Sequence, residues 1–144
     1  MIVQEVMTAN VSCVQQTDSI QKAAQTMKSV NCGSLPVCEN NKVVGIITDR
    51  DIVLKSIAEG QYNASVRDCM TNRVITCTPE MDVHQAAELM SEHQIRRLPV
   101  VDSSGNICGM CAIGDLATIH IHVNEAGDAL SKISEPSAGQ NAVH

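Results

Sequence analysis

The sequence has almost no aromatic residues: phenylalanine and tryptophan are absent, and Tyr62 is the single tyrosine. Proteins that bind single-stranded nucleic acid usually stack bases on aromatic rings, so this partner is disfavoured. The chain has 10 basic against 16 acidic residues, and a net charge of −6 disfavours nucleic acid and anionic membranes as partners. Long apolar runs and a secretory pattern are also lacking. We therefore expect a soluble, cytoplasmic protein with no nucleic-acid or membrane partner.

Motifs for catalysis and metal binding are lacking too. No nucleophile is accompanied by a base and an orienting group, and neither a P-loop nor a G-x-G-x-x-G turn occurs. The pattern His120-x-His122 could hold a metal together with His84 or His93, but a lone H-x-H has no third ligand at a defined spacing, so we expect no metal site. The chain is therefore not expected to be an enzyme.

The seven cysteines form an odd set without the spacing of a small secreted domain, which indicates mostly buried, reduced thiols. Cys108 and Cys111 fit C-x-x-C, the pattern of a redox pair. They fall in a predicted strand, where positions i and i+3 point to opposite faces, so a redox pair is disfavoured. Cys13 and Cys38 lie on two apolar strands that can be neighbours. Both a reversible disulfide and two buried thiols are consistent with that placement.

The sequence does contain an internal repeat of one segment. Met7 and Met70 are 63 positions apart, and so are Leu35–Val37 and Leu98–Val100. One extra residue in a turn makes the offset 64 for the later matches, which are Gly45 with Gly109 and Asp51 with Asp115. A segment too small to bury its own apolar face has been duplicated, so we expect a pseudo-twofold axis and clefts between the copies.

Each copy is predicted to be strand, helix, strand, strand, helix, which is an α/β fold. Apolar residues at i, i+3, i+4 and i+7 predict the first helix of each copy, and apolar runs bounded by polar turns predict the strands. The elements of copy one are Val11–Val14, a helix from Ser19, Ser34–Cys38, Val43–Thr48 and a helix from Asp49 that ends before Gly60. Those of copy two are Arg73–Cys77, Asp82–His93, Arg97–Val101, Ile107–Ala112 and a helix from Gly114. A further short helix is predicted over Asn124–Ile133, and a frayed end beyond Glu135.

The junction at Thr48–Asp51 is the main candidate site. A buried strand ends at Thr48 and a helix begins at once, so free backbone N–H groups can receive a phosphate. Asp51 can accept hydrogen bonds from both ribose hydroxyls, with the Thr48 hydroxyl beside it. The same spacing also predicts a capping box, in which the acid bonds a free backbone donor. The spacing alone leaves both interpretations open.

The matching junction in copy two differs in its chemistry. It keeps Asp115 but has Ala112 where copy one has a threonine, so a ribose site there is expected to be weaker or changed. Arg96 and Arg97 stand at the start of the predicted strand Arg97–Val101, whereas copy one has Gly33–Ser34 at the matching positions. Two arginines can form a fork for phosphate oxygens, although a solvated pair or salt bridges to nearby acids fit equally well.

These residues resemble the CBS domain, named after cystathionine beta-synthase. The resemblance rests on Met7–Thr8, Leu35–Val37 and Gly45–Ile52, repeated as Met70–Thr71, Arg97–Asp102 and Gly109–Leu116. It covers about residues 1–123 and is similar to a stand-alone tandem pair, a Bateman module, as in small bacterial two-CBS proteins of the hypoxic response protein type. It implies domains at residues 7–60 and 70–123, packed through their sheets, followed by a short helix and tail at 124–144.

The resemblance also implies a function and site residues. CBS pairs often bind AMP, ADP or ATP, and sometimes S-adenosylmethionine, in the clefts between repeats, and they commonly dimerise. The implied ligand contacts are Thr48, Asp51, Asp115, Ile113 and Gly114, with Arg96 and Arg97 placed where related nucleotide sensors contact phosphate. We thus expect a non-catalytic sensor without an obligatory cofactor, forming a homodimer and acting on an unidentified protein partner. The alternative is a ligand-free interaction protein, or one that responds to redox state or metal.

Overall fold

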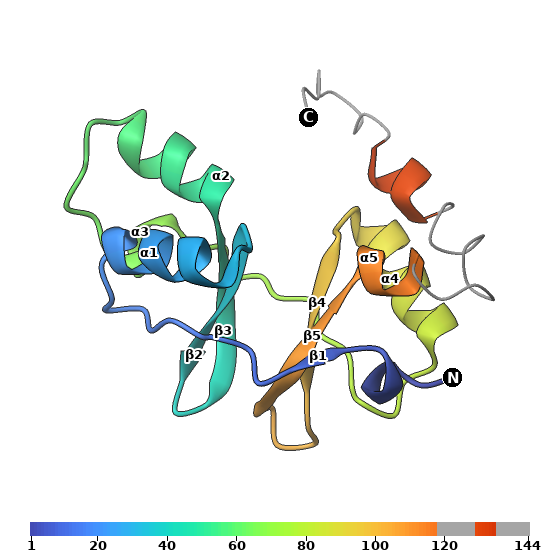
Figure 1. Cartoon of the computed structure of the whole chain (residues 1–144). Coiled ribbons are helices and arrows are strands. Elements are labelled where there is room, and N and C mark those ends of the chain that lie inside the picture. The colour runs from blue at the N-terminus through green and yellow to red at the C-terminus, as the bar shows by residue number, and fades with distance from the viewer. Residues whose placement is uncertain (118–128, 135–144) are drawn as a thin grey trace. The chain divides into compact units, whose positions relative to one another are not determined.

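A computed structural model describes residues 1–117 and 129–134, and it separates the chain into two compact units (Figure 1). The copy-one unit consists of Asn10–Val74 with Ser103–Ile107. The copy-two unit consists of Met1–Ala9, Ile75–Asp102 and the described residues from Cys108 onward. The first nine residues therefore belong to the unit of the second copy. Within the described ranges, no helix is long and apolar enough to span a bilayer.

The copy-one unit is built around helix α1 (Ile20–Val30) and its hairpin. The helix begins where the Ser19 hydroxyl accepts a hydrogen bond from the Lys22 amide at 3.0 Å, and it ends at Asn31, whose φ of 54° is left-handed. Its buried face packs in an apolar core with the strands and the two following helical segments. That core contains Val14, Ile20, Ala23, Met27, Leu35, Val37, Ile47, Ile52, Val66 and Cys69.

The hairpin of the copy-one unit carries the first candidate junction at its end. Strands β2 (Ser34–Glu39) and β3 (Lys42–Thr48) are antiparallel and are joined by a turn at Asn40 and Asn41, which have φ of 50° and 68°. Asparagine tolerates this left-handed conformation, which a two-residue hairpin turn requires. The chain then passes directly into α2 (Asp49–Ile52) and the π-helical turn η2 (Val53–Ile57), and α3 (Val66–Cys69) follows.

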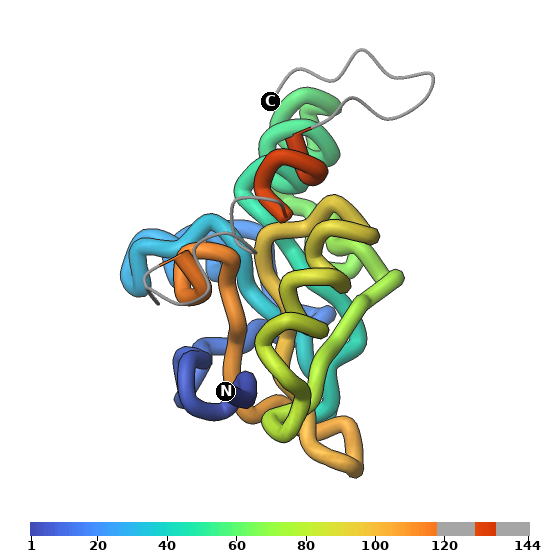
Figure 2. The backbone as a smooth tube through the Cα atoms, turned by 90° about the vertical axis from the view of Figure 1, so that its right-hand side faces the viewer, coloured from blue at the N-terminus to red at the C-terminus, as the bar shows by residue number. Residues whose placement is uncertain are grey.

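The copy-two unit repeats this arrangement and adds a strand from the amino terminus. Helix α4 (Val83–His93) packs on β4 (Arg97–Val101) and β5 (Ile107–Ala112), which leads into α5 (Ile113–Ala117) (Figures 1 and 2). The first residues form a 3₁₀ turn, η1 (Val3–Glu5), and strand β1 (Thr8–Ala9), which pairs antiparallel with β5. The sheet order is β1-β5-β4.

Most of the predicted elements are confirmed, with two corrections. Val11–Val14 and Arg73–Cys77 are not strands: only Val14 and Cys77 make isolated parallel bridges, to Val37 and Val100. The strand β1, in turn, lies earlier than any strand the sequence predicted. For the predicted Asn124–Ile133 helix, the structure has helical residues at 129–133, while 124–128 and the predicted frayed end lie outside the described residues.

Candidate functional site

The Thr48–Asp51 junction forms a complete capping box. The Thr48 hydroxyl accepts a hydrogen bond from the Asp51 amide at 3.0 Å, and the Asp51 carboxylate accepts one from the Thr48 amide, also at 3.0 Å. The two groups thereby hold one another at the start of α2. The capping interpretation is confirmed. The ribose contact remains a prediction, and the capping geometry is compatible with it because each carboxylate oxygen has a second lone pair.

The second oxygen of Asp51 has a cationic neighbour. Oδ1 lies 3.1 Å from Nζ of Lys55, one turn further along the helix. The Asp51 side chain is only 15% exposed, whereas that of Lys55 is 46% exposed. An ion pair with one exposed partner contributes little stability, so a ligand that donates to Oδ1 can displace the lysine at small cost.

The copy-two junction keeps half of this arrangement. The Asp115 carboxylate accepts a hydrogen bond from the Ala112 amide at 2.8 Å, which matches the Thr48–Asp51 bond. In copy one, the Asp51 amide also donates to the Thr48 hydroxyl. Ala112 has no hydroxyl, so the Asp115 amide cannot make the corresponding hydrogen bond. The aspartate is thus positioned in the same way in both copies, and the threonine hydroxyl distinguishes them.

The structure brings the arginine pair next to the copy-two junction. The Arg96 carbonyl accepts a hydrogen bond from the Ile113 amide at 2.8 Å, so Arg96 adjoins the first residue of α5. The Arg96 side chain is exposed and that of Arg97 is half-buried, and neither makes an ion pair with any residue that the structure describes. The backbone of Arg96 therefore adjoins the start of α5, where the predicted residues Ile113, Gly114 and Asp115 lie.

The glycines at the matching positions 45 and 109 allow a close approach of the backbone. A Cβ on Gly45 would lie 2.8 Å from the carbonyl oxygen of Thr71, and one on Gly109 would lie 2.6 Å from that of Thr8. The close neighbour at each glycine is backbone. The Met-Thr segment that precedes one copy packs on the hairpin of the other, a pairing that the matching Met7–Thr8 and Met70–Thr71 motifs could have suggested.

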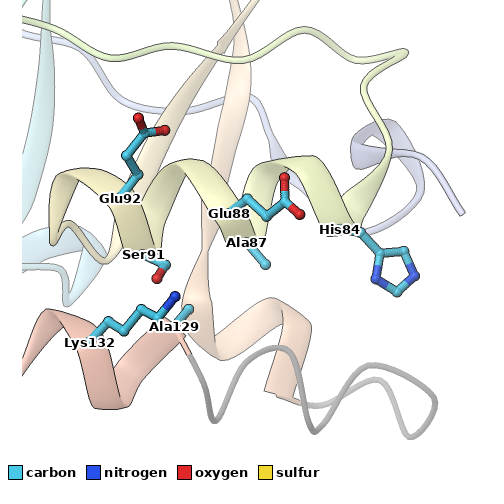
Figure 3. Close-up of a pocket in the computed structure, with 7 residues that line it drawn as sticks. All are labelled: His84, Ala87, Glu88, Ser91, Glu92, Ala129 and Lys132. Atoms are coloured by element: carbon cyan, nitrogen blue, oxygen red, sulfur yellow. The ribbon is translucent and has the colours of Figure 1, made fainter.

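A separate groove lies in the copy-two unit between α4 and the helical residues 129–133 (Figure 3). It has a volume of about 560 Å³ and contains none of the predicted site residues. Its lining residues are His84, Ala87, Glu88, Ser91, Glu92, Ala129 and Lys132. Charged side chains of both signs lie along its rim, which favours solvent over an apolar ligand.

The cysteine pattern lies on one strand, and the histidine pattern lies outside the described residues. Cys108 and Cys111 both lie on β5, where Cys111 is fully buried and Cys108 is half-buried. His120 and His122 lie outside the described residues. In the part of the chain that the structure describes, no three histidine, cysteine or acidic residues gather as a metal site.

Comparison with known families assigns the sequence to one class of protein. The CBS-domain profile matches residues 3–57 and 66–121, which makes up most of the chain. The protein belongs to the CBS-domain family, with two CBS repeats in one small α/β chain.

Small proteins of the same type are among its relatives. The chain is 41% identical over 133 residues to the CBS domain-containing protein YhcV of Bacillus subtilis, covering 92% of this chain and 94% of YhcV. It is 31% identical over 116 residues to hypoxic response protein 1 of Mycobacterium tuberculosis, covering 78% and 80%. The resemblance to small tandem CBS proteins is confirmed.

Two similar solved structures contain adenosine-based ligands. The CBS domain pair of protein MJ0100, in complex with 5'-methylthioadenosine and S-adenosyl-L-methionine, has a TM-score of 0.74 and 29% identity, covering 81% of this chain and 93% of that one. CBSX2 of Arabidopsis thaliana in complex with AMP also has a TM-score of 0.74, with 27% identity, covering 85% and 98%. These two CBS-domain proteins thus bind adenosine derivatives.

Proposed function

We propose that this protein is a cytoplasmic, non-catalytic regulatory module that binds an adenine nucleotide at its strand–helix junctions. In the copy-one unit, Thr48 and Asp51 would contact the ribose. In the copy-two unit, Asp115 would contact a ribose while Arg96 and Arg97 contact phosphate, with Ile113 and Gly114 lining the junction. AMP, ADP and ATP are the leading candidates, and S-adenosylmethionine is the next.

The observation that carries this proposal is the position of Asp51. Its carboxylate is 15% exposed, fixed by the Thr48 amide at 3.0 Å and balanced by an exposed lysine. A largely buried carboxylate with remaining lone pairs is suited to accept hydrogen bonds from both hydroxyls of a ribose. Binding would regulate a partner only if the nucleotide binds two conformations of the module with different affinity.

Isothermal titration calorimetry with AMP, ADP, ATP and S-adenosylmethionine tests the proposal. We expect at least one of them to bind with a dissociation constant below millimolar, and Asp51→Ala to weaken that binding about tenfold or more, as expected when charge-assisted hydrogen bonds are lost. Because Asp51→Ala also removes a helix cap, its folding must be matched by a control.

Asp68→Ala is the matched control. Asp68 caps α3 in the same unit, accepting from the amide and the hydroxyl of Ser65 at 3.0 and 3.1 Å, and is not among the proposed ligand contacts. It should lose a cap yet keep nucleotide affinity. Absence of binding by every ligand, or equal binding by wild type and Asp51→Ala, would contradict the proposal.

We further propose that the protein is a homodimer joined through the exposed apolar face of η2. Val53, Leu54 and Ile57 are 53%, 47% and 47% exposed, although residues of this type are usually buried. Multi-angle light scattering should give twice the monomer mass, and Leu54→Glu should give the monomer. A monomeric wild type would contradict this part of the proposal.

A further inference from the structure

Cys13 and Cys38 are the two cysteines that the copy-one unit brings into contact. Their Sγ atoms are 3.2 Å apart, with the Cys38 thiol donating to the Cys13 sulfur. The segment carrying Cys13 is fixed beside β2 by two backbone hydrogen bonds, from Val14 to Pro36 at 3.1 Å and from Cys38 to Val14 at 2.9 Å. A disulfide has an S–S distance of about 2.0 Å, so the sulfurs need to approach by only about 1 Å.

The two thiols are unequal in a way that suits sequential oxidation. The hydrogen bond from Cys38 lowers the pKa of Cys13, whose side chain is also half-exposed. The same bond, together with burial and the Glu39 carboxylate, raises the pKa of Cys38. The thiolate is the reactive form, so oxidant would react first at Cys13 and Cys38 would resolve the product.

None of the other five cysteines combines a lowered pKa with a neighbouring sulfur. Burial raises the pKa values of Cys69, Cys77, Cys108 and Cys111. Cys32 is half-buried like Cys13, but its Sγ lies 3.2 Å from the carbonyl oxygen of Ser34 rather than beside another sulfur. None of the seven cysteines forms a disulfide in this structure.

We propose that Cys13 and Cys38 are a site of redox modification that closes to a reversible disulfide on exposure to hydrogen peroxide. The Cys13 thiolate attacks one peroxide oxygen, the O–O bond breaks, and Cys13 becomes a sulfenic acid as hydroxide leaves. The Cys38 sulfur then attacks the Cys13 sulfur, the S–O bond breaks, and water leaves with the Cys38 proton. Two thiols are oxidised by two electrons in all, and one peroxide is reduced to two waters. A cellular dithiol would return both residues to thiols. This site does not depend on nucleotide binding.

Peptide mapping of the full-length protein tests the proposal. The reduced protein is freed of reductant, treated with one equivalent of hydrogen peroxide, alkylated and digested with trypsin without reduction. We expect a linked species joining Met1–Lys22 to Ser29–Lys42, lighter than the two peptides by two hydrogens and separated again by dithiothreitol. Fragmentation must place the bond on Cys38, because Cys32 lies on the same peptide.

Two variants sharpen the result. Cys32→Ser should form the linked species as wild type does. Cys13→Ser should abolish it and slow thiol loss to peroxide by about tenfold, since the low-pKa thiol is removed. The proposal is overturned if no Cys13–Cys38 link forms, if the link uses Cys32, if Cys13 accumulates as sulfinic acid without a link, or if Cys13→Ser is oxidised as fast as wild type.

Discussion

Cys77 and Cys111 lie in the apolar core of the copy-two unit, 1% and 0% exposed. Burial raises the pKa of each from 9.0 to about 12, because a thiolate there would be separated from water. The nearby Cys77 thiol further raises the pKa of Cys111. Between pH 9 and 12 the unfolded chain therefore holds fewer protons on these residues than the folded chain does.

We predict that the protein loses stability as pH rises through this window. The contribution of these thiols is complete below their unfolded pKa, and each can lower the free energy of unfolding by up to about 1.4 kcal/mol per pH unit above it. Urea unfolding from pH 7 to above 10 measures the slope. Cys111→Ala should reduce the slope, because it removes one of the two buried thiols. Equal slopes in wild type and Cys111→Ala would contradict the assignment.

The chemistry of the first candidate site was predictable because it is local. Thr48 and Asp51 are three residues apart, so the capping box follows from spacing, and the structure contains both of its hydrogen bonds. The ribose contact was not decidable in the same way, since a cap and a ligand use the same oxygen atoms. Whether Arg96 and Arg97 pair with acids was equally undecidable from the sequence, because it depends on which acids the fold places near them; among the described residues neither makes an ion pair.

At the scale of elements, a single glycine permits the close approach between each hairpin and the Met-Thr segment beside it. In the copy-one unit, the backbone of Thr71 pairs with Ile46, with N–O distances of 3.0 and 2.8 Å. A side chain at Gly45 would lie 2.8 Å from the Thr71 oxygen and 3.1 Å from the Met70 sulfur. The sulfur can move aside, but the backbone oxygen is held by the pairing.

We therefore predict that Gly45→Ala lowers the free energy of unfolding by about 1–3 kcal/mol, the usual cost of overpacking. Gly114→Ala is the matched control, because a Cβ there meets nothing within 4 Å and alanine favours a helix over glycine by about 0.5–1 kcal/mol. Urea unfolding of both variants should give changes of opposite sign. A neutral Gly45→Ala would show that the Thr71 segment is free to move.

Helices and hairpins were predicted well because their signals are periodic and short-range. The α1 face formed by Ile20, Ala23 and Met27 is buried as its spacing indicates. The errors concern strands, whose existence depends on partners elsewhere in the chain. Val11–Val14 is apolar enough for a strand, but it meets β2 only through the bridge at Val14. The two residues of β1 have no strand-like pattern and pair because β5 offers an edge.

At the scale of the whole molecule, the amino terminus is part of the copy-two unit. Val3 is completely buried in that unit's core, and its amide donates to the Met81 carbonyl at 2.8 Å. Thr8 and Ala9 then lie opposite Met110 and Gly109 on β5. The copy-two unit therefore includes nine residues that precede copy one, and the copy-one unit includes Met70 and Thr71, which precede copy two.

Deleting residues 1–9 should consequently destabilise the copy-two unit in particular. The loss of Val3 burial alone is worth about 1.5–3 kcal/mol, and β5 also loses its pairing partner. Hydrogen exchange should become faster in β5 and α4 than in β2 and β3. The exposed neighbour Gln4 provides the control, because Gln4→Ala should leave both sets of amides unchanged while Val3→Ala reproduces part of the deletion. Unchanged protection of β5 in the deleted chain would contradict the prediction. It would show that the copy-two repeat folds stably without the amino-terminal segment.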